Sequence, residues 1–256
     1  LYKKFPVTRM KFAKTEPLKS TKITLYIITA LILSITINAS AEENEDPLEP
    51  INRVIFEFNE VVDDNILEPV AKGYKYVTPD PVERGVSNFF SNLGEINTIA
   101  NDLLQLKFQQ AAKDSLRFVV NSTIGVFGIF DVATTFGLSK NKEDFGQTLG
   151  YWGIPNGPYL VLPFLGPSSF RDAPGSFMDY ELSPIEQLHH EERQTLRLMN
   201  IVETRAKLLR ATKILDTAAK DKYIFIRESY LQKRESLVRD GENEEEFEID
   251  VYGIDD

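Results

Sequence analysis

The sequence predicts an all-α protein whose helices form a single domain, and three observations support this fold class. Between residues 46 and 239, apolar residues recur at steps of three and four, which is the period of an amphipathic helix. Glycine and proline are concentrated between residues 144 and 170, where they make up nine of 27 residues, so this segment is expected to form a structured loop region with a short hairpin. With 42% hydrophobic and 27% charged residues, the chain can bury a core and is too polar for a polytopic membrane protein.

The formal net charge of −10 is distributed unevenly along the chain. Residues 1–22 sum to +6, residues 23–239 sum to −7, and residues 240–256 carry nine acidic residues and no basic one. Such a run of like charges favours a disordered acidic tail. The acidic balance argues against a nucleic-acid partner, because binding to phosphates needs an excess of lysine and arginine.

The first 41 residues are typical of a secretory signal peptide. A basic segment is followed by nineteen uncharged residues, 23–41, which end in Ala39-Ser-Ala41. Cleavage is expected after Ala41, and a retained membrane anchor is the alternative. Either interpretation predicts export. The expected organisation is a signal peptide at 1–41, a short acidic linker at 42–45, a helical domain at 46–239 and the acidic tail at 240–256.

The helical domain is expected to begin with an amphipathic helix. Asp46 is predicted to cap it, with Pro47 at the first helical position and Gly73 near its end. Its apolar face consists of Leu48, Ile51, Ile55, Phe58, Val62, Ile66 and Val70.

Three further helices are predicted at about 81–94, 96–106 and 108–124. The first of them has an unusual polar face, which carries no charge although solvent-facing helices usually carry lysine and glutamate. This face consists of Ser87, Asn88, Ser91 and Asn92.

Residues 118–138 contain a single charge, Asp131, together with four phenylalanines. A buried helix pair, a segment lying in a bilayer interface and an ordinary core all fit this pattern. In the following Gly/Pro-rich segment a hairpin is predicted around 159–162, and its aromatic residues either anchor the protein at a bilayer surface or pack under loops. The candidate interface anchors are Phe127, Phe130, Tyr151, Trp152 and Tyr159. Helical periodicity returns from Pro184 and again over about 218–239.

No catalytic or cofactor motif is found in the sequence. The two histidines, His189 and His190, are adjacent, and adjacent helical residues point about 100° apart, so they are not expected to share a metal. Arg171 and Asp172 are interpreted as a structural ion pair. We therefore expect no enzyme, no cofactor and no metal site.

Several motifs occur in a fixed order and identify a family resemblance. They are Asp46-Pro-Leu-Glu-Pro-Ile-Asn-Arg53, Ser87-Asn-Phe89, Phe118-Val-Val-Asn-Ser-Thr-Ile-Gly125, Asp144-Phe-Gly-Gln-Thr-Leu-Gly-Tyr-Trp-Gly153, Gly157-Pro-Tyr-Leu-Val-Leu-Pro163, Gly166-Pro-Ser168, Arg171-Asp172 and Glu203-Thr-Arg-Ala206. With this pattern the chain resembles the MlaA family, also called VacJ, over about residues 46–239.

The resemblance implies a ring-shaped helical protein whose helices lie largely in the membrane plane, in the inner leaflet of a Gram-negative outer membrane. It implies that phospholipids are removed from the outer leaflet and passed to a periplasmic MlaC-like carrier, with an outer-membrane porin trimer as a partner. On this basis the uncharged face with Phe89 is expected to line a lipid channel: Ser87, Asn88, Phe89, Ser91 and Asn92. The residues with an expected structural role are Asp46, Pro47, Asn52, Arg53, Arg171 and Asp172.

One departure from the family concerns the membrane anchor. Family members are typically lipoproteins with a cysteine after the signal segment, whereas these 256 residues contain no cysteine. Retention at the membrane is then expected to depend on apolar surface or on a porin. A soluble periplasmic lipid carrier and a non-transporting, porin-associated scaffold stay open as alternatives.

Overall fold

The computed structural model describes residues 46–241, which lie within one compact unit, and it confirms the predicted helical class. The predicted signal peptide, the linker and all but the first two residues of the tail lie outside the described residues. The described elements are α2 (Glu49–Val62), the π-helical turn η2 (Asp63–Leu67), α3 (Glu68–Val77), α4 (Asp80–Leu104), α5 (Phe108–Thr123), α6 (Val132–Thr135), α7 (Phe145–Tyr151), β1 (Tyr159–Leu162), β2 (Gly166–Ser169), α8 (Asp172–Leu182), the 3₁₀ helix η3 (Pro184–Gln187), α9 (His190–Ala218) and α10 (Lys222–Val238).

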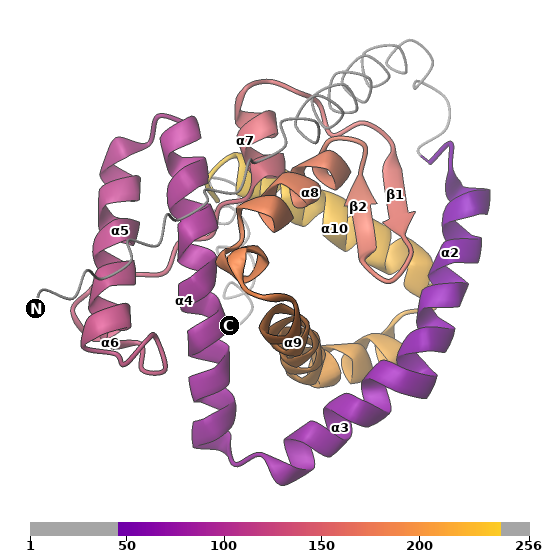
Figure 1. Cartoon of the computed structure of the whole chain (residues 1–256). Helices are drawn as coiled ribbons and strands as arrows, with labels where there is room; N and C mark the ends of the chain where they lie inside the picture. The colour runs from indigo at the N-terminus through magenta and orange to yellow at the C-terminus, as the bar shows by residue number, and fades with distance from the viewer. Residues whose placement is uncertain (1–45, 242–256) are drawn as a thin grey trace, which may run out of the picture. The chain divides into compact units, whose positions relative to one another are not determined.

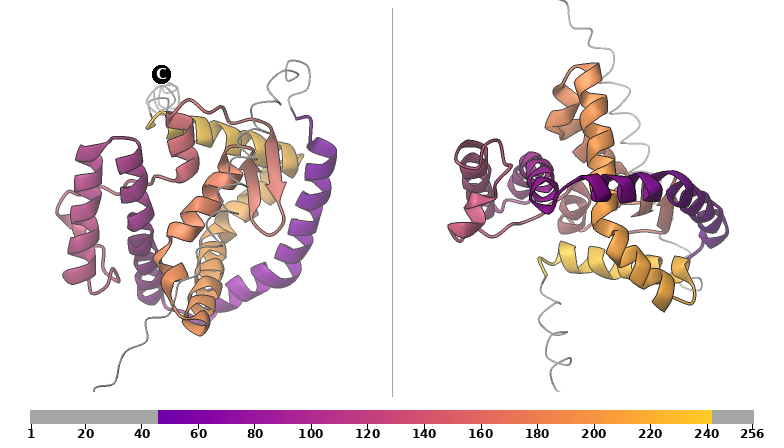
Figure 2. Two further views of the ribbon diagram at one scale, coloured as in Figure 1. Left: turned by 45° about the horizontal axis from the view of Figure 1, so that its top comes forward. Right: turned by 90° about the horizontal axis from the view of Figure 1, so that it is seen from below.

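The helices of this unit are arranged around α9. In Figure 1, α2, α3 and α4 lie on three sides of α9, and α7, α8 and the hairpin close the remaining side. Figure 2 shows that α2 to α5 lie in one layer, which α9 crosses, and that α10 lies to one side of that layer. The expected ring of helices is thus present, and α9 lies inside it.

The first helix differs from its prediction at both ends. It begins at Glu49 after an N-cap at Leu48, with Pro50 in the first turn, and it continues through η2 and α3 past Gly73. The prediction of Asp46 as cap and Pro47 as first helical residue is therefore wrong. The Asp46 carboxylate instead contacts the hydroxyl of Tyr223 and the guanidinium of Arg227, so it ties the start of the domain to α10.

Other helix boundaries also need correction. The two helices predicted at 81–94 and 96–106 are one 25-residue helix, α4. A single glycine at Gly94 does not interrupt it, because one glycine costs only about 1 kcal/mol in a helix. The long helix predicted from Pro184 begins at His190, after the short helix η3, and α8 was not predicted.

The predicted hairpin is present and is held by α2. Strands β1 and β2 pair antiparallel, with Tyr159 opposite Ser169. The side chain of Asn52 donates to the carbonyl of Tyr159 at 2.9 Å and accepts from the amide of Val161 at 3.0 Å. Asn59, seven residues and two turns further along α2, binds Leu162 at the end of the same strand and Phe164 in the turn that follows it. The two asparagines thus satisfy the backbone groups of an edge strand that would otherwise lie open.

Replacing Asn52 with alanine is expected to destabilise the fold. Asn52 is only 1% exposed, so the change leaves a buried carbonyl and a buried amide without partners. Each such group costs about 1–3 kcal/mol, so the two predict a loss of about 2–6 kcal/mol in the free energy of unfolding. Thermal unfolding in detergent measures it, with Asn65→Ala, an exposed site on η2, as the matched control. Equal melting temperatures for the two variants would contradict this role of Asn52.

Candidate functional site

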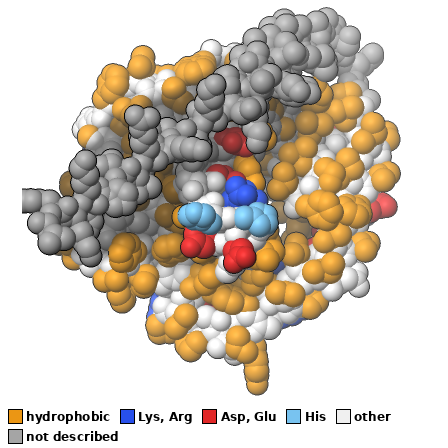
Figure 3. All heavy atoms as spheres, viewed as in Figure 1, with side chains coloured by type: hydrophobic (Ala, Val, Ile, Leu, Met, Phe, Trp, Pro, Cys, Tyr) orange, Lys and Arg blue, Asp and Glu red, His pale blue; other side chains and the backbone are white. Residues whose placement is uncertain are grey.

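Polar side chains make up most of the buried interior of this protein, and many large apolar side chains lie on its exterior. Within residues 46–241, 23 polar or charged residues are buried against 10 hydrophobic ones. In the same part of the chain 36 large hydrophobic side chains are exposed. Figure 3 shows this on one face, where apolar side chains spread over the surrounding helices while histidine and acidic side chains gather at the centre, near the start of α9. Water-soluble proteins have the opposite distribution, so this exterior suits an apolar environment.

The exposed apolar residues continue from one helix to the next. From α2 through η2 to α3 they include part of the predicted apolar face, with Ile51, Phe58, Ile66 and Val70 all exposed. Among the described residues, no helix combines the length and the apolar character that crossing a bilayer requires.

The residues predicted to form one channel face of α4 point in two directions around the helix. The side chain of Asn88 donates to the carbonyl of Ile129 at 3.1 Å, and that of Asn92 donates to the hydroxyl of Ser122 at 2.9 Å. Asn92 is also buried, and a Cβ atom at Gly128 would lie 2.4 Å from its Cβ. Asn88 and Asn92 therefore support the turn after α5, which corrects the expectation that they share one channel face with the serines.

Ser87 and Ser91 lie on a different side of α4, about 100° around the helix. Both are half-buried, and neither hydroxyl has a hydrogen bond to another residue of 46–241. Phe89 packs edge-on against Phe90, with 5.3 Å between the ring centroids. Of the five predicted channel residues, Ser87, Phe89 and Ser91 thus have side chains that form no hydrogen bond or ion pair within residues 46–241.

Four of the five candidate anchors are exposed, and Tyr159 is not. Phe127 and Phe130 lie on the turn held by Asn88 and Asn92, and they are 75% and 60% exposed. Tyr151 and Trp152 are exposed at the end of α7. The prediction for Tyr159 is wrong, because its ring is buried against Tyr223 and Tyr230, where the strand alternation turns it inward.

A buried arginine on α5, Arg117, binds residues that follow the same turn. The Arg117 guanidinium donates to Glu95 at 2.9 Å and to Asp131 at 2.6 Å, and also to the carbonyl of Leu138 at 2.7 Å. Arg117 and Glu95 are each 2% exposed. Hydrogen bonds from Thr134, Arg117 and Asn121 outweigh partial burial and lower the pKa of Asp131 to about 2. The single charge of residues 118–138 is thus the counter-ion of a buried arginine.

A second buried arginine joins α10 to α7 and α8. Arg234 donates to Asp144 at 2.6 and 2.8 Å and lies 2.8 Å from Asp172. Despite burial, Arg234 lowers the pKa of Asp144, and Arg171 and Arg234 lower that of Asp172. The expected pair of Arg171 with Asp172 is present at 2.7 Å.

Two glycines allow this second network to form. A Cβ atom at Gly175 would lie 2.6 Å from the backbone nitrogen of Gly146, so α7 and α8 approach backbone to backbone. That approach brings the first residue of α8 and the cap of α7, Asp172 and Asp144, to the same guanidinium.

The remaining predicted structural residues lie at the α2–α10 contact. Arg53 donates to Glu49 at 2.7 Å and to Asp221 at 2.9 Å, and its guanidinium lies 4.5 Å from the centre of the Tyr223 ring. Pro47 is exposed beside this contact. The predicted motif residues Asp46, Asn52 and Arg53 therefore fasten α2 to other elements.

Two buried carboxyl groups face each other between α4 and α5. Asp102 and Asp114 are both fully buried, and the Asn141 amide donates to Asp114 at 3.2 Å. Burial, followed by the hydrogen bond and charge of Asp114, raises the pKa of Asp102 to about 8. Asp102 therefore binds a proton in the folded protein at neutral pH.

This raised pKa predicts a pH dependence of stability. Between the ordinary aspartate pKa near 4 and about 8, the folded state binds more protons than the unfolded state, so the free energy of unfolding falls as the pH rises. Asp102→Asn is expected to remove part of this fall, which makes it more stable than the wild type at pH 8.5. Melting temperatures from pH 5 to 8.5 measure it, with exposed Asp64→Asn as control. A wild-type slope retained in Asp102→Asn would contradict the assignment.

The sequence did not predict the two arginine networks or the carboxyl pair. A signal was available only for the first network, because Asp131 is the lone charge in residues 118–138 and a lone charge in an apolar segment needs a counter-ion. The residues of the second network are far apart in the chain, and only the fold joins them.

Comparison with known proteins gives the family. The family described as MlaA lipoprotein matches residues 44–237. The intermembrane phospholipid transport system lipoprotein MlaA of Escherichia coli K12 is 33% identical over 218 residues, which cover 84% of this chain and 86% of that protein. An uncharacterized protein of Rickettsia typhi is 36% identical over 200 residues, covering 77% and 80%.

A solved structure gives the same result for the fold. A chain described under "Structural basis for maintenance of bacterial outer membrane lipid asymmetry" aligns with a TM-score of 0.67 and 35% sequence identity, over 76% of this chain and 100% of that one. The match extends over most of the helical domain, where the buried networks lie. The chain belongs to the MlaA lipoprotein family.

Proposed function

We propose that this protein is a component of an intermembrane phospholipid transport system that maintains the lipid asymmetry of an outer membrane. It removes phospholipids from the outer leaflet and passes them to a periplasmic carrier. The observation that carries the proposal is the inverted distribution of side chains, with a polar, hydrogen-bonded interior and an apolar exterior. Such a protein can lie in one leaflet and offer headgroups a polar path. The names of the relatives support the same function.

The layer of α2 to α5 supports an in-plane position in the membrane (Figure 2). Their exposed apolar residues, together with Phe127, Phe130, Tyr151 and Trp152, form the lipid-facing surface. Ser87, Phe89 and Ser91 line the lipid route, and Asn88 and Asn92 support its wall. The protein acts at the periplasmic face of the outer membrane beside a porin trimer and delivers lipid to an MlaC-like carrier.

The proposed role is transport, with no chemical conversion of the lipid. It predicts that the purified protein releases no fatty acid from phospholipid vesicles. Steady release that scales with protein concentration would contradict it.

A gene deletion tests the function. Cells without the protein are expected to accumulate phospholipid in the outer leaflet, measured as product released by phospholipase added to intact cells, and the wild-type gene should restore the low level. Unchanged product in the deletion strain would contradict transport. Fractionation after a high-salt wash separates the alternatives: an embedded component stays with outer membranes, and a soluble carrier does not.

A further inference from the structure

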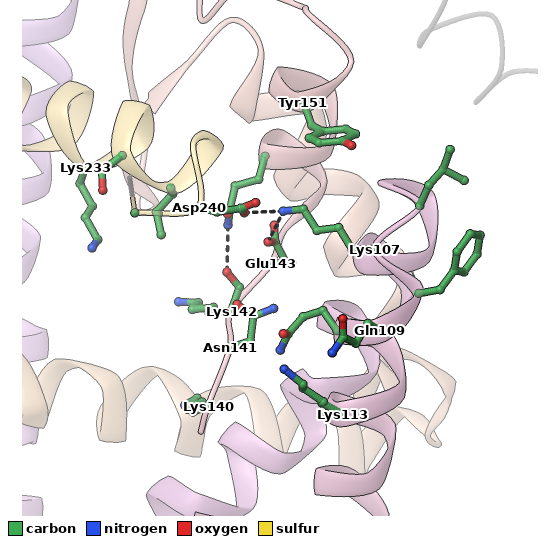
Figure 4. A pocket seen from close by; sticks show the side chains of 17 residues that line it. Lys107, Gln109, Lys113, Lys140, Asn141, Lys142, Glu143, Tyr151, Lys233 and Asp240 are labelled. Atoms are coloured by element: carbon green, nitrogen blue, oxygen red, sulfur yellow. Dashed lines mark hydrogen bonds and ion pairs between the residues drawn. The ribbon is translucent and has the colours of Figure 1, made fainter. Parts of the chain in front are cut away.

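A cavity of about 920 Å³ lies away from the proposed lipid route, between the α4–α5 turn, residues 140–143 and the end of α10 (Figure 4). Lysines from four separate segments line it: Lys107, Lys113, Lys140, Lys142 and Lys233. Only two acidic residues, Glu143 and Asp240, share the lining, so the lining residues carry a formal charge of +3.

The two acidic residues are both engaged by one lysine. Lys107 Nζ lies 3.1 Å from Glu143 Oε1, and Asp240 contacts the same ammonium group. Figure 4 shows this contact, with Lys113 and Lys140 at some distance from it. In the part of the chain that the structure describes, neither these two lysines nor Lys142 forms an ion pair. Three cationic groups thus line one cavity without a direct ion pair.

Two buried carboxyl groups lie behind the lining of the cavity. Asp102 lies behind Asn141, and burial raises its pKa to about 8. The carboxyl group of Asp114 accepts from the amides of Gln110 at 3.0 Å and Asn141 at 3.2 Å. Burial lowers the pKa of Lys140 against the attraction of Glu95, and repulsion from Lys142 adds to the decrease. An anion in the cavity would relieve that repulsion.

An apolar rim adjoins the lysines. Leu106 and Phe108 line the cavity and are 69% and 63% exposed. Leu106 has a φ of +61°, in the left-handed region that a leucine rarely adopts. The amide of Lys107, bonded to the carbonyl of Asp102 at 2.9 Å, holds this turn. The backbone therefore keeps an apolar side chain exposed beside the cationic groups, which fits an anion that carries an apolar chain.

We propose that this cavity binds a phosphate group, with Lys113, Lys140 and Lys142 as its cationic ligands. Leu106 and Phe108 contact any apolar chain attached to that phosphate. Two sources supply such a group, a phospholipid headgroup and inorganic phosphate. The lipid source rests on the proposed function, whereas the phosphate site itself does not.

Binding to the full-length protein in detergent tests the site. The probes are the soluble anionic lipid dihexanoyl-phosphatidylglycerol and inorganic phosphate. The triple variant Lys113→Gln/Lys140→Gln/Lys142→Gln is expected to bind the probe at least tenfold more weakly than the wild type. The control Arg210→Gln/Lys213→Gln/Lys220→Gln removes three exposed cationic groups elsewhere and should stay within twofold. The corresponding lysine-to-arginine triple keeps the charge and should retain binding, which separates charge loss from misfolding.

The two probes distinguish the sources. Binding of the lipid with little competition from phosphate assigns a headgroup, and equal affinity for both assigns inorganic phosphate. No binding of either probe to the wild type, or equal loss in the glutamine and control triples, would overturn the site. The deletion experiment does not depend on this result, because it measures outer-leaflet lipid in cells.

Discussion

Replacing Arg117 with methionine is expected to lower the free energy of unfolding by about 3–5 kcal/mol, because it leaves a buried charge without its partner. Glu95, 2% exposed, then loses its ion pair with Arg117, and Asp131 loses its ion pair with the same guanidinium. Burial already raises the pKa of Glu95 even beside Arg117. In the variant Glu95 must bind a proton to stay buried, so the loss should be larger at pH 8 than at pH 5. Chemical unfolding in detergent at both pH values measures the effect.

Two further variants separate the loss of the buried ion pair from the loss of any arginine side chain. Arg210→Met changes an exposed arginine and should cost less than about 0.5 kcal/mol. Arg117→Met combined with Glu95→Gln removes the stranded charge and should recover part of the loss. A single variant as stable as Arg210→Met would show that this network does not hold α4, α5 and the turn together.

Replacing Phe127 and Phe130 with asparagine is expected to weaken membrane binding by two orders of magnitude or more. Burying one phenylalanine in an apolar phase is worth about 1.5–3 kcal/mol, so two contribute about 3–6 kcal/mol. Phe127 has a φ of +56°, which asparagine tolerates better than phenylalanine, so the variant should not lose stability through this position. Flotation with phospholipid vesicles measures binding.

The matched control replaces both phenylalanines with leucine and should bind vesicles nearly as well as the wild type. Asparagine variants that float like the leucine variants would remove this turn from the lipid-facing surface. A lowered melting temperature in the asparagine variant alone would instead assign the rings a packing role.

The sequence predicted local features well and long-range contacts poorly. The helical class and the strand at 159–162 follow from residue periodicity and turn chemistry, which act over a few residues. Asp46 was assigned as a helix cap because a cap is a local contact, whereas its partners Tyr223 and Arg227 lie about 180 residues away. The two helices predicted on either side of Gly94 are one helix, α4, and its packing against α5 is a contact that the periodicity does not report.

The same reason limits the prediction of sites. An aromatic side chain in a Gly/Pro-rich segment can point inward or outward, and Tyr159 differs from Trp152 only through the strand that buries it. The uncharged face of α4 stands out in the sequence, yet its four residues point in two directions around the helix. The lysine cavity combines four segments of the chain, so no spacing in the sequence marks it.

The central claim, that the exposed apolar surface lies in lipid, is tested most directly with the fluorescence of Trp152. It is the only tryptophan in the chain, it is half exposed, and its indole N–H is already bonded to the carbonyl of Leu104 at 3.2 Å. In vesicles containing phospholipids brominated on their acyl chains, its emission is expected to be strongly quenched, while aqueous iodide quenches it little. Strong quenching by iodide with none by the brominated lipids would place Trp152 in water and contradict the claim.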